Sequence, residues 1–355
     1  GLGDWEPSTK KLPRGLSYIA KEALKRKVDF GIWLEPEMVN PQSELYQKHP
    51  DWIITQPKRT PILGRHQEIL DLTRPEVQAF EWQVIDKTLR PNPDISYVKW
   101  DCNRYITQPG SGYLQPAEQS HLWIDYNWAL YRLMERFSKE FPNVMAMLCA
   151  GGSGRVDYGA LPYFHSFWPS DNTDPLGRIK IQWGFSHFFP ASTISAHVTR
   201  MGKRHLKLAI DVALSGAFGI DLALDKATAE ERVQIADAVK LYKASIRPLV
   251  MQGELYRLVS PYEHPMASLS YVSTDKNDAV VYLYQIQDGS VPQVILGGLD
   301  ARKNYRVEEV GLPKGSTSRF PGHGKIFSGA ELMSTGIANP LNAQFESAIL
   351  LLKTQ

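Results

Sequence analysis

Short apolar runs alternate with helical patterns over the first 250 residues, and this alternation constrains the fold more than any other feature of the sequence. Strands separated by helices are typical of parallel βα units. The predicted strands are 28–36, 95–101, 144–152, 163–171, 192–199 and 217–224, the last two being weaker. The predicted helices are 71–90, 124–141 and 228–250. The sequence therefore predicts six consecutive parallel βα units.

The predicted helices carry recognisable start and stop signals. Pro75 lies near the N-terminus of the first helix, where a proline is tolerated, and Pro142 follows the second helix. Thr228 and Glu231 have the spacing of a capping box, in which each side chain accepts a backbone N–H of the first turn. These signals support the helical interpretation of all three segments.

After residue 260 the pattern changes to short β-type segments separated by Gly, Pro, Asp and Asn, with no helical pattern among them. The segments are ASLSYVS, DAVVYLYQI, PQVILGGL, NYRVEEV and SAILLLKT. We therefore predict a partial barrel domain over residues 1–258 and an antiparallel β-sandwich domain over residues 259–355. Six parallel units favour a TIM (β/α)₈-type barrel that lacks its first two strands. An open doubly wound sheet is the alternative, but no Gly-rich phosphate loop follows any strand.

Composition argues against several classes of function. The formal net charge of +2 comes from scattered basic residues, which disfavours nucleic-acid binding, and no apolar run approaches a membrane span. The only cysteines are Cys102 and Cys149, too few for a disulfide framework. His187, His197 and His205 lack the spacing of a helical metal pair, so we expect no metal and no cofactor. Ser153 lies outside any GxSxG elbow.

Polar residues gather at the carboxyl ends of the predicted strands, the active-site face of a parallel barrel. In YVKWDCNR, Lys99 and Asp101 are two residues apart and so point the same way. Lys99 would keep Asp101 ionised, which suits a nucleophile. Asp171 follows the apolar FWP, which would desolvate its carboxyl and raise its pKa, as suits a general acid. Two carboxylates ending different strands are what glycosidic bond cleavage requires.

Each of these motifs also has a purely structural explanation. Glu35 and Glu37 of EPEM resemble first-turn acids, which a helix dipole favours. The stretch SDNTD (170–174) has the composition of an Asx-turn or a helix N-cap. The segment CAGGSGR has that of a flexible loop. Only their combination favours a catalytic site.

The motifs together closely resemble the α-galactosidases of glycoside hydrolase family 36. GDWEPSTKKLPRGL, GIWLEPEMV, RPEV, YVKWDCNR, CAGGSGRVDYGAL, PSDNTDP and ISAHVTR occur in the order of that family and cover nearly the whole chain. KWDxNR followed about seventy residues later by SDNTD is the most specific combination. The resemblance implies a TIM barrel, a C-terminal antiparallel β-domain and a retaining reaction on terminal α-linked galactose.

The resemblance also implies roles for individual residues. It makes Asp101 of KWD the nucleophile and Asp171 of SDNTD the acid/base. The alternative that Asp174 is the acid stays open, although a loop-shaping role beside Asp171 is the expected one. The residues expected to contact substrate are Trp33, Arg65, Lys99, Asn103, Cys149, Gly152, Trp168 and Asp174.

Members of that family carry further sequence before this region, including two barrel strands and a DDGW-type motif whose aspartates bind galactose. The chain starts after that point, so an inactive fragment or a carbohydrate-binding remnant is an alternative to the galactosidase. Galactosyl transfer and α-N-acetylgalactosamine removal are others. We expect α-galactoside oligosaccharides as partners, with no nucleic acid and no membrane, and a homo-oligomer is compatible with the sequence. The compartment stays open between cytoplasm and periplasm or secretion, because a signal peptide would precede Gly1.

Overall fold

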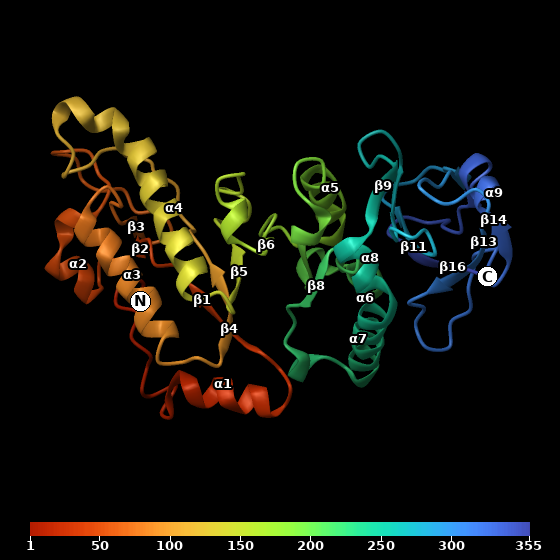
Figure 1. Ribbon diagram of the computed structural model, residues 1–355, viewed down its shortest axis with the longest axis horizontal. Helices are drawn as coiled ribbons and strands as arrows, with labels where there is room; N and C mark the ends of the chain where they lie inside the picture. Colours follow the sequence, from red (N-terminus) through yellow and green to blue (C-terminus); the bar gives the residue numbers. More distant parts are fainter. The chain divides into compact units, whose positions relative to one another are not determined.

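The computed structural model describes residues 1–355 and consists of two compact units, Gly1–Trp168 and Pro169–Gln355 (Figure 1). The border between these units falls inside the predicted barrel domain, and the division at 258/259 stays a prediction. Each unit is described by itself below. None of the helices combines the length and the apolar character that crossing a membrane requires.

The first unit contains a four-stranded parallel sheet in the order β1-β4-β5-β6. Its strands are β1 (Phe30–Leu34), β4 (Ile95–Trp100), β5 (Met145–Leu148) and β6 (Ser166–Phe167). They confirm the first four predicted strands. Trp33 pairs with Lys99 in register, and Lys99 pairs with Met147. The residues that follow β1, β4 and β5 therefore meet at one edge of the sheet.

Helices α3 (Pro75–Leu89) and α4 (Leu122–Glu140) confirm two predicted helices, and they lie side by side (Figure 1). Phe137 of α4 packs edge-on against Trp100 of β4, with ring centres 6.1 Å apart, which holds α4 against the sheet. Two short strands, β2 (Met38–Val39) and β3 (Glu68–Ile69), form an antiparallel ladder. The unit also has α1 (Gly15–Lys25), α2 (Glu44–Lys48) and 3₁₀ turns at Pro50–Trp52, Pro116–His121 and Leu161–Tyr163.

The second unit begins with the remaining parallel strands, β7 (Ser195–Val198) and β8 (Ala217–Ile220), which confirm the last two predicted strands. The predicted helix 228–250 consists of α7 (Ala229–Leu241), a π-helical turn (Tyr242–Ile246) and α8 (Arg247–Gln252). Thr228 and Glu231 form the predicted capping box. Helices α5 (Pro175–Phe185) and α6 (Leu206–Ala213) and 3₁₀ turns at Ala191–Thr193, Met201–Lys203 and Leu224–Lys226 complete this part.

The rest of the second unit is an antiparallel sheet of six strands in the order β14-β13-β16-β11-β10-β9. Its strands are β9 (Glu254–Val259), β10 (Met266–Val272), β11 (Asp278–Gln285), β13 (Asn304–Val310), β14 (Ile326–Ser328) and β16 (Ser347–Thr354). A separate pair joins β12 (Gln293–Val294) and β15 (Ile337–Ala338).

The absence of a helix after residue 260 was the wrong prediction, because α9 (Gly329–Ser334) lies between β14 and β15. The helix is only six residues long, too short to complete the i, i+3, i+4, i+7 apolar spacing by which a sequence reveals a helix. Its start signal is local, since the Ser328 hydroxyl accepts the backbone N–H of Glu331.

Three buried tyrosines join this sheet to the end of α6. Tyr271, Tyr282 and Tyr284 donate hydrogen bonds of 2.8–3.1 Å to backbone carbonyls of residues 215, 214 and 211. These carbonyls lie at the C-terminus of α6, where helical carbonyls lack partners within the helix. The helices and the sheet of the second unit consequently share one hydrophobic core.

Candidate active site

The end of β4 brings Lys99 and Asp101 together as predicted. The Lys99 ammonium lies 3.9 Å from Asp101 Oδ2 and 5.2 Å from the centre of the Trp168 ring. Asp101 is only 4% exposed, so its carboxylate has lost nearly all contact with water. A buried carboxylate requires compensating partners.

Hydrogen-bond donors surround the Asp101 carboxylate. Trp33 Nε1 donates to Oδ2 at 3.0 Å and the Cys102 amide donates to Oδ1 at 2.9 Å. Burial by itself raises the pKa of Asp101, but hydrogen bonds from Trp33, Asn103, Cys149 and the Cys102 amide together bring this pKa below its ordinary value. The sequence analysis credited Lys99 with keeping Asp101 ionised. The strongest contributions come instead from these donors.

A second acid, Glu35, follows β1 directly and is 1% exposed. The backbone N–H of Asn103 donates to its Oε1. Burial raises the pKa of Glu35 to about 7, the Asn103 backbone hydrogen bond opposes this, and the nearby Asp101 charge raises it further. The sequence analysis noted Glu35 but left it out of the site.

Arg65 lies in a tight turn closed by two backbone hydrogen bonds between Gly64 and Gln67. Arg65 and His66 have φ values of 56° and 62°, a left-handed conformation that costs energy for residues with a side chain. The turn is tied to the Asp101 loop because Arg104 forms a buried ion pair of 3.1 Å with Glu68. This arrangement holds the exposed Arg65 at the same edge of the sheet.

A cavity of about 500 Å³ opens over these side chains. Trp33, 41% exposed, is part of its wall, and the Trp5 and Trp33 rings lie 5.8 Å apart. Exposed aromatic faces beside carboxylate, amide and guanidinium groups suit a polar ring-shaped ligand. The lining residues are Gly1, Leu2, Trp5, Trp33, Glu35, Asn40, Arg65, Gln67 and Asn103.

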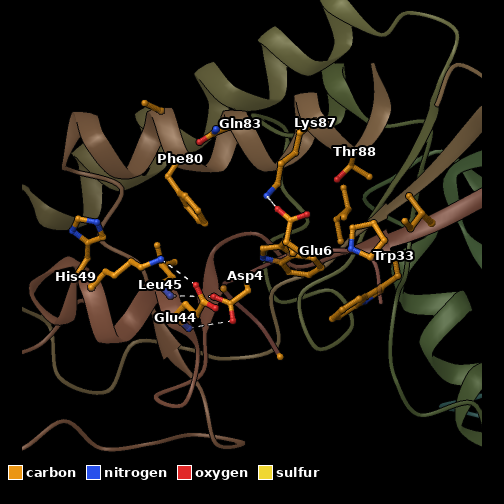
Figure 2. A pocket seen from close by; sticks show the side chains of 18 of the residues that line it. Asp4, Glu6, Trp33, Glu44, Leu45, His49, Phe80, Gln83, Lys87 and Thr88 are labelled. Carbon is orange, nitrogen blue, oxygen red and sulfur yellow. Dashed lines mark hydrogen bonds and ion pairs between the residues drawn. The ribbon is translucent and has the colours of Figure 1, made fainter. Parts of the chain in front are cut away.

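A larger cavity of about 1280 Å³ runs between the N-terminal segment, β1, α2 and α3, and Figure 2 shows part of its lining. Two of its carboxylates, those of Asp4 and Glu6, already have partners. Asp4 accepts the first-turn amides of α2, and Glu6 accepts Lys87 at 2.5 Å. None of the carboxylates that line this larger cavity is buried, whereas Glu35 of the smaller cavity is 1% exposed.

The loop after β5 contributes from the other side of β4. Cys149 is fully buried, and burial raises the pKa of its thiol to about 12, so that it donates to Asp101 as a neutral group. Gly152 has φ +100°, a conformation that side chains rarely adopt, and its carbonyl accepts the Ala150 amide. Trp168 packs with Cys149 and Met147 in a small buried cluster.

Glu37, two residues after Glu35, is fully buried and accepts hydrogen bonds from three different elements. Trp100 Nε1 at the end of β4, the Tyr126 hydroxyl of α4 and Arg155 of the loop after β5 lie 3.0, 2.7 and 2.5 Å from its oxygens. Trp100, the residue before Asp101, is thereby hydrogen-bonded to the ion pair of Glu37 and Arg155. Sequence reasoning missed this role, and the repeated acid in EPEM was its only signal.

The remaining site candidates belong to the second unit. Asp174 is the N-cap of α5, accepts the Leu176 amide at 3.3 Å and forms an ion pair of 3.2 Å with Arg204. This confirms the N-cap interpretation of SDNTD. Asp171 is exposed, so the prediction that FWP would desolvate its carboxyl is wrong: Phe167 and Trp168 are buried within the first unit.

The first unit thus brings together seven of the sequence-predicted residues around the end of β4. They are Trp33, Arg65, Lys99, Asp101, Asn103, Cys149 and Trp168, with Gly152 in the adjoining loop. Glu35, Glu37 and Arg104 are additions from the structure. No group of three or more His, Cys, Asp or Glu side chains with the arrangement of a metal site occurs.

Comparison with protein families matches the two parts of the chain to two models. Residues 1–253 match the melibiase family, and residues 266–352 match the glycosyl hydrolase family 36 C-terminal domain.

Individual relatives agree with these family matches. Alpha-galactosidase AgaA of Geobacillus stearothermophilus is 39% identical over 96% of this chain and 46% of its own length. The crystal structure of AgaB from the same organism has a TM-score of 0.91 at 38% identity, covering all of this chain and 48% of AgaB. An AgaA variant crystallised with raffinose has the same TM-score at 37% identity, again over the whole chain and 49% of AgaA.

The similarity to these structures shows the fold: part of a TIM barrel, followed by a C-terminal antiparallel sheet domain. The chain spans about half the length of the curated relatives that it matches.

Proposed function

This chain belongs to the melibiase family of glycoside hydrolases, family 36, and on that premise we propose that the protein is a retaining exo-α-galactosidase. Asp101 is the nucleophile and Asp171 is the acid/base. Terminal α-linked galactose of raffinose-like and melibiose-like oligosaccharides is the proposed substrate. The complex of a relative with raffinose supports this substrate class.

In the first step, an Asp101 carboxylate oxygen attacks the anomeric carbon of galactose. The bond between that carbon and the glycosidic oxygen breaks, and Asp171 transfers its proton to the leaving oxygen. The products are a galactosyl ester of Asp101 and the rest of the oligosaccharide with a free hydroxyl group.

In the second step, a water molecule attacks the same carbon and the ester bond to Asp101 breaks. Asp171, now ionised, takes the proton of the attacking water, which regenerates both carboxyl groups. Two inversions at one carbon leave the released galactose with the configuration of the substrate. In retaining enzymes of this type the two carboxyl groups lie about 5–5.5 Å apart.

One observation carries the proposal: Asp101 is buried at a strand end, yet hydrogen bonds keep its pKa below the ordinary value. A buried carboxylate that stays ionised is a poorly hydrated nucleophile at neutral pH. Lys99 adjoins it, and the Trp33 and Asn103 side chains that hold it also line the cavity. A purely structural aspartate has no need of an open cavity beside its donors.

The test is hydrolysis of an aryl α-galactoside by the protein and by Asp101→Asn, with the anomer of the released galactose followed by NMR. We expect α-galactose first, and no turnover by the variant. Release of β-galactose would contradict the retaining mechanism. Equal rates for both proteins would remove Asp101 from the chemistry. Tests with α-N-acetylgalactosaminides and with acceptor sugars check the hydrolase against the two related reactions.

The alternative function is galactoside binding without turnover, for which Trp33 and the polar side chains of the smaller cavity would suffice. Calorimetric titration of this chain with galactose separates the two functions, since binding without hydrolysis supports the second one.

A further inference from the structure

The backbone ladder between β1 and β4 ends just where the candidate nucleophile begins. The Asp101 amide donates to the Leu34 carbonyl at 2.8 Å, which is the last backbone rung between the two strands. In a parallel ladder the next amide on the same side, that of Asn103, would donate to the carbonyl of Pro36. It donates instead to the Glu35 carboxylate.

Asn103 also connects the two acids through its side chain. Its carboxamide lies close enough to both carboxylates to favour their ionised forms as a hydrogen-bond donor, while its backbone N–H is held by Glu35 Oε1. The Asn103 side chain can hold the Asp101 carboxylate in one orientation only if Asn103 itself is fixed. Glu35 is the residue that fixes it.

We propose that Glu35 is a positioning residue for the nucleophile, which holds Asn103 so that its carboxamide orients the Asp101 carboxylate toward the anomeric carbon. The inference rests on the proposed function, because it takes Asp101 as the nucleophile. Glu35 acts through Asn103. A role for Glu35 in simple packing does not explain why a charged group is 99% buried against another carboxylate, since like charges at close range repel.

This role depends on pH in a defined direction. The groups that face Glu35 are Asp101 and Cys102 at the end of β4 and Arg65 of the 64–67 turn. Ionised Glu35 accepts both Asn103 donors as charge-assisted hydrogen bonds, and these weaken when the carboxyl is protonated. Since burial raises the pKa of Glu35 to about 7, the fixed state of Asn103 prevails above pH 7 and is lost below it.

The experiment measures kcat/KM against pH in the full-length protein, with an aryl α-galactoside whose phenol is acidic enough to leave without proton transfer from Asp171. This substrate reports attack by Asp101 alone. We expect Glu35→Ala to lower kcat/KM by about 100-fold, the loss typical of a reacting group displaced by about 1 Å.

Glu35→Gln keeps an acceptor oxygen for the Asn103 amide but has no titratable group. We expect the wild-type profile to fall as the pH drops through about 7, and this inflection to be absent in Glu35→Gln. Glu135→Gln is the matched control, because it makes the same change on α4, where the partly exposed Glu135 carboxylate forms an ion pair of 2.6 Å with Lys139. It should leave the profile unchanged.

A crystal structure of Glu35→Ala makes the result independent of turnover. We expect the Asn103 carboxamide to leave Asp101. The positioning role would be overturned if Asn103 kept its contact with Asp101 in the Glu35→Ala structure. It would also be overturned if the inflection of the pH profile persisted in Glu35→Gln. If the wild-type protein hydrolyses no galactoside while Asn103 is released in the variant, the proposed function fails, and what stands is only that Glu35 fixes Asn103 beside Asp101.

Discussion

Asp101 and Asp171 differ in how far the residues of their own unit bury and hydrogen-bond their carboxyl groups. Asp101 is 4% exposed and accepts hydrogen bonds from side chains and backbone on β1, β4 and β5 or the loops that follow them. Asp171 is exposed in a short segment before α5, where the neighbouring Asp174 caps the helix. The proposed nucleophile is therefore fully preorganised, whereas the proposed acid stands on an open turn.

The difference corresponds to the demands of the two roles. A nucleophile must stay ionised and aligned with one carbon atom, and burial among fixed hydrogen-bond donors achieves both. An acid/base exchanges a proton in both steps and needs access to the leaving group and then to water. We therefore expect substitutions around Asp101 to be costly in rate and in stability, and substitutions around Asp171 to be costly mainly in rate.

The largest effect is expected from Asp101→Asn. The amide is isosteric but cannot form the galactosyl ester, so the rate should fall by about 10⁴-fold or more, as when other catalytic nucleophiles are removed. Steady-state hydrolysis of an aryl α-galactoside measures it. Thermal unfolding is the control, because a folded but inactive variant separates lost chemistry from lost structure. A loss of less than tenfold would show that Asp101 is not the nucleophile.

Asp171→Asn should cost about 10²–10⁴-fold, the usual contribution of a general acid or base. Its signature is selectivity among substrates. The formation of the galactosyl ester should slow strongly for raffinose and only slightly for a galactoside with an acidic phenol, which leaves without a proton. Single-turnover measurements with both substrates test this. An equal loss with both would assign Asp171 to binding.

Glu37→Gln extends the comparison to stability. It removes the charge that faces the mostly buried Arg155, 2.5 Å away, and leaves only Glu81, a buried carboxyl whose pKa burial raises well above its ordinary value, near the guanidinium. Breaking a buried ion pair in this way typically costs about 3–5 kcal/mol of unfolding free energy. Urea denaturation followed by tryptophan fluorescence measures it. A change in unfolding free energy below about 1 kcal/mol would show that the Glu37–Arg155 ion pair contributes little to the stability of the region around Asp101.

The sequence was most informative where periodicity and chemistry coincide. The two-residue spacing of Lys99 and Asp101 is enough to place both on one side of β4, and the six parallel strands follow from their apolar runs. The exposure of Asp171 was not predictable, because adjacent apolar residues in the chain do not determine which way a turn faces. Glu35 could not be assigned either, since its partner Asn103 is 68 residues away.

The smallest effect is expected at Asp174, and it decides whether Asp174 or Asp171 is the acid. Asp174→Asn keeps an N-cap oxygen but loses the partly exposed ion pair with Arg204, so it should cost at most about 1 kcal/mol. Asp174→Ala also loses the cap, which adds about 1 kcal/mol. Thermal unfolding ranks the two variants. Because neither change touches proton transfer in the proposed mechanism, raffinose hydrolysis should stay within about threefold of wild type below the melting temperature. A loss of about 10²-fold or more in folded Asp174→Asn, confined to substrates with poor leaving groups, would identify Asp174 as the acid and leave Asp171 as a surface residue of the turn.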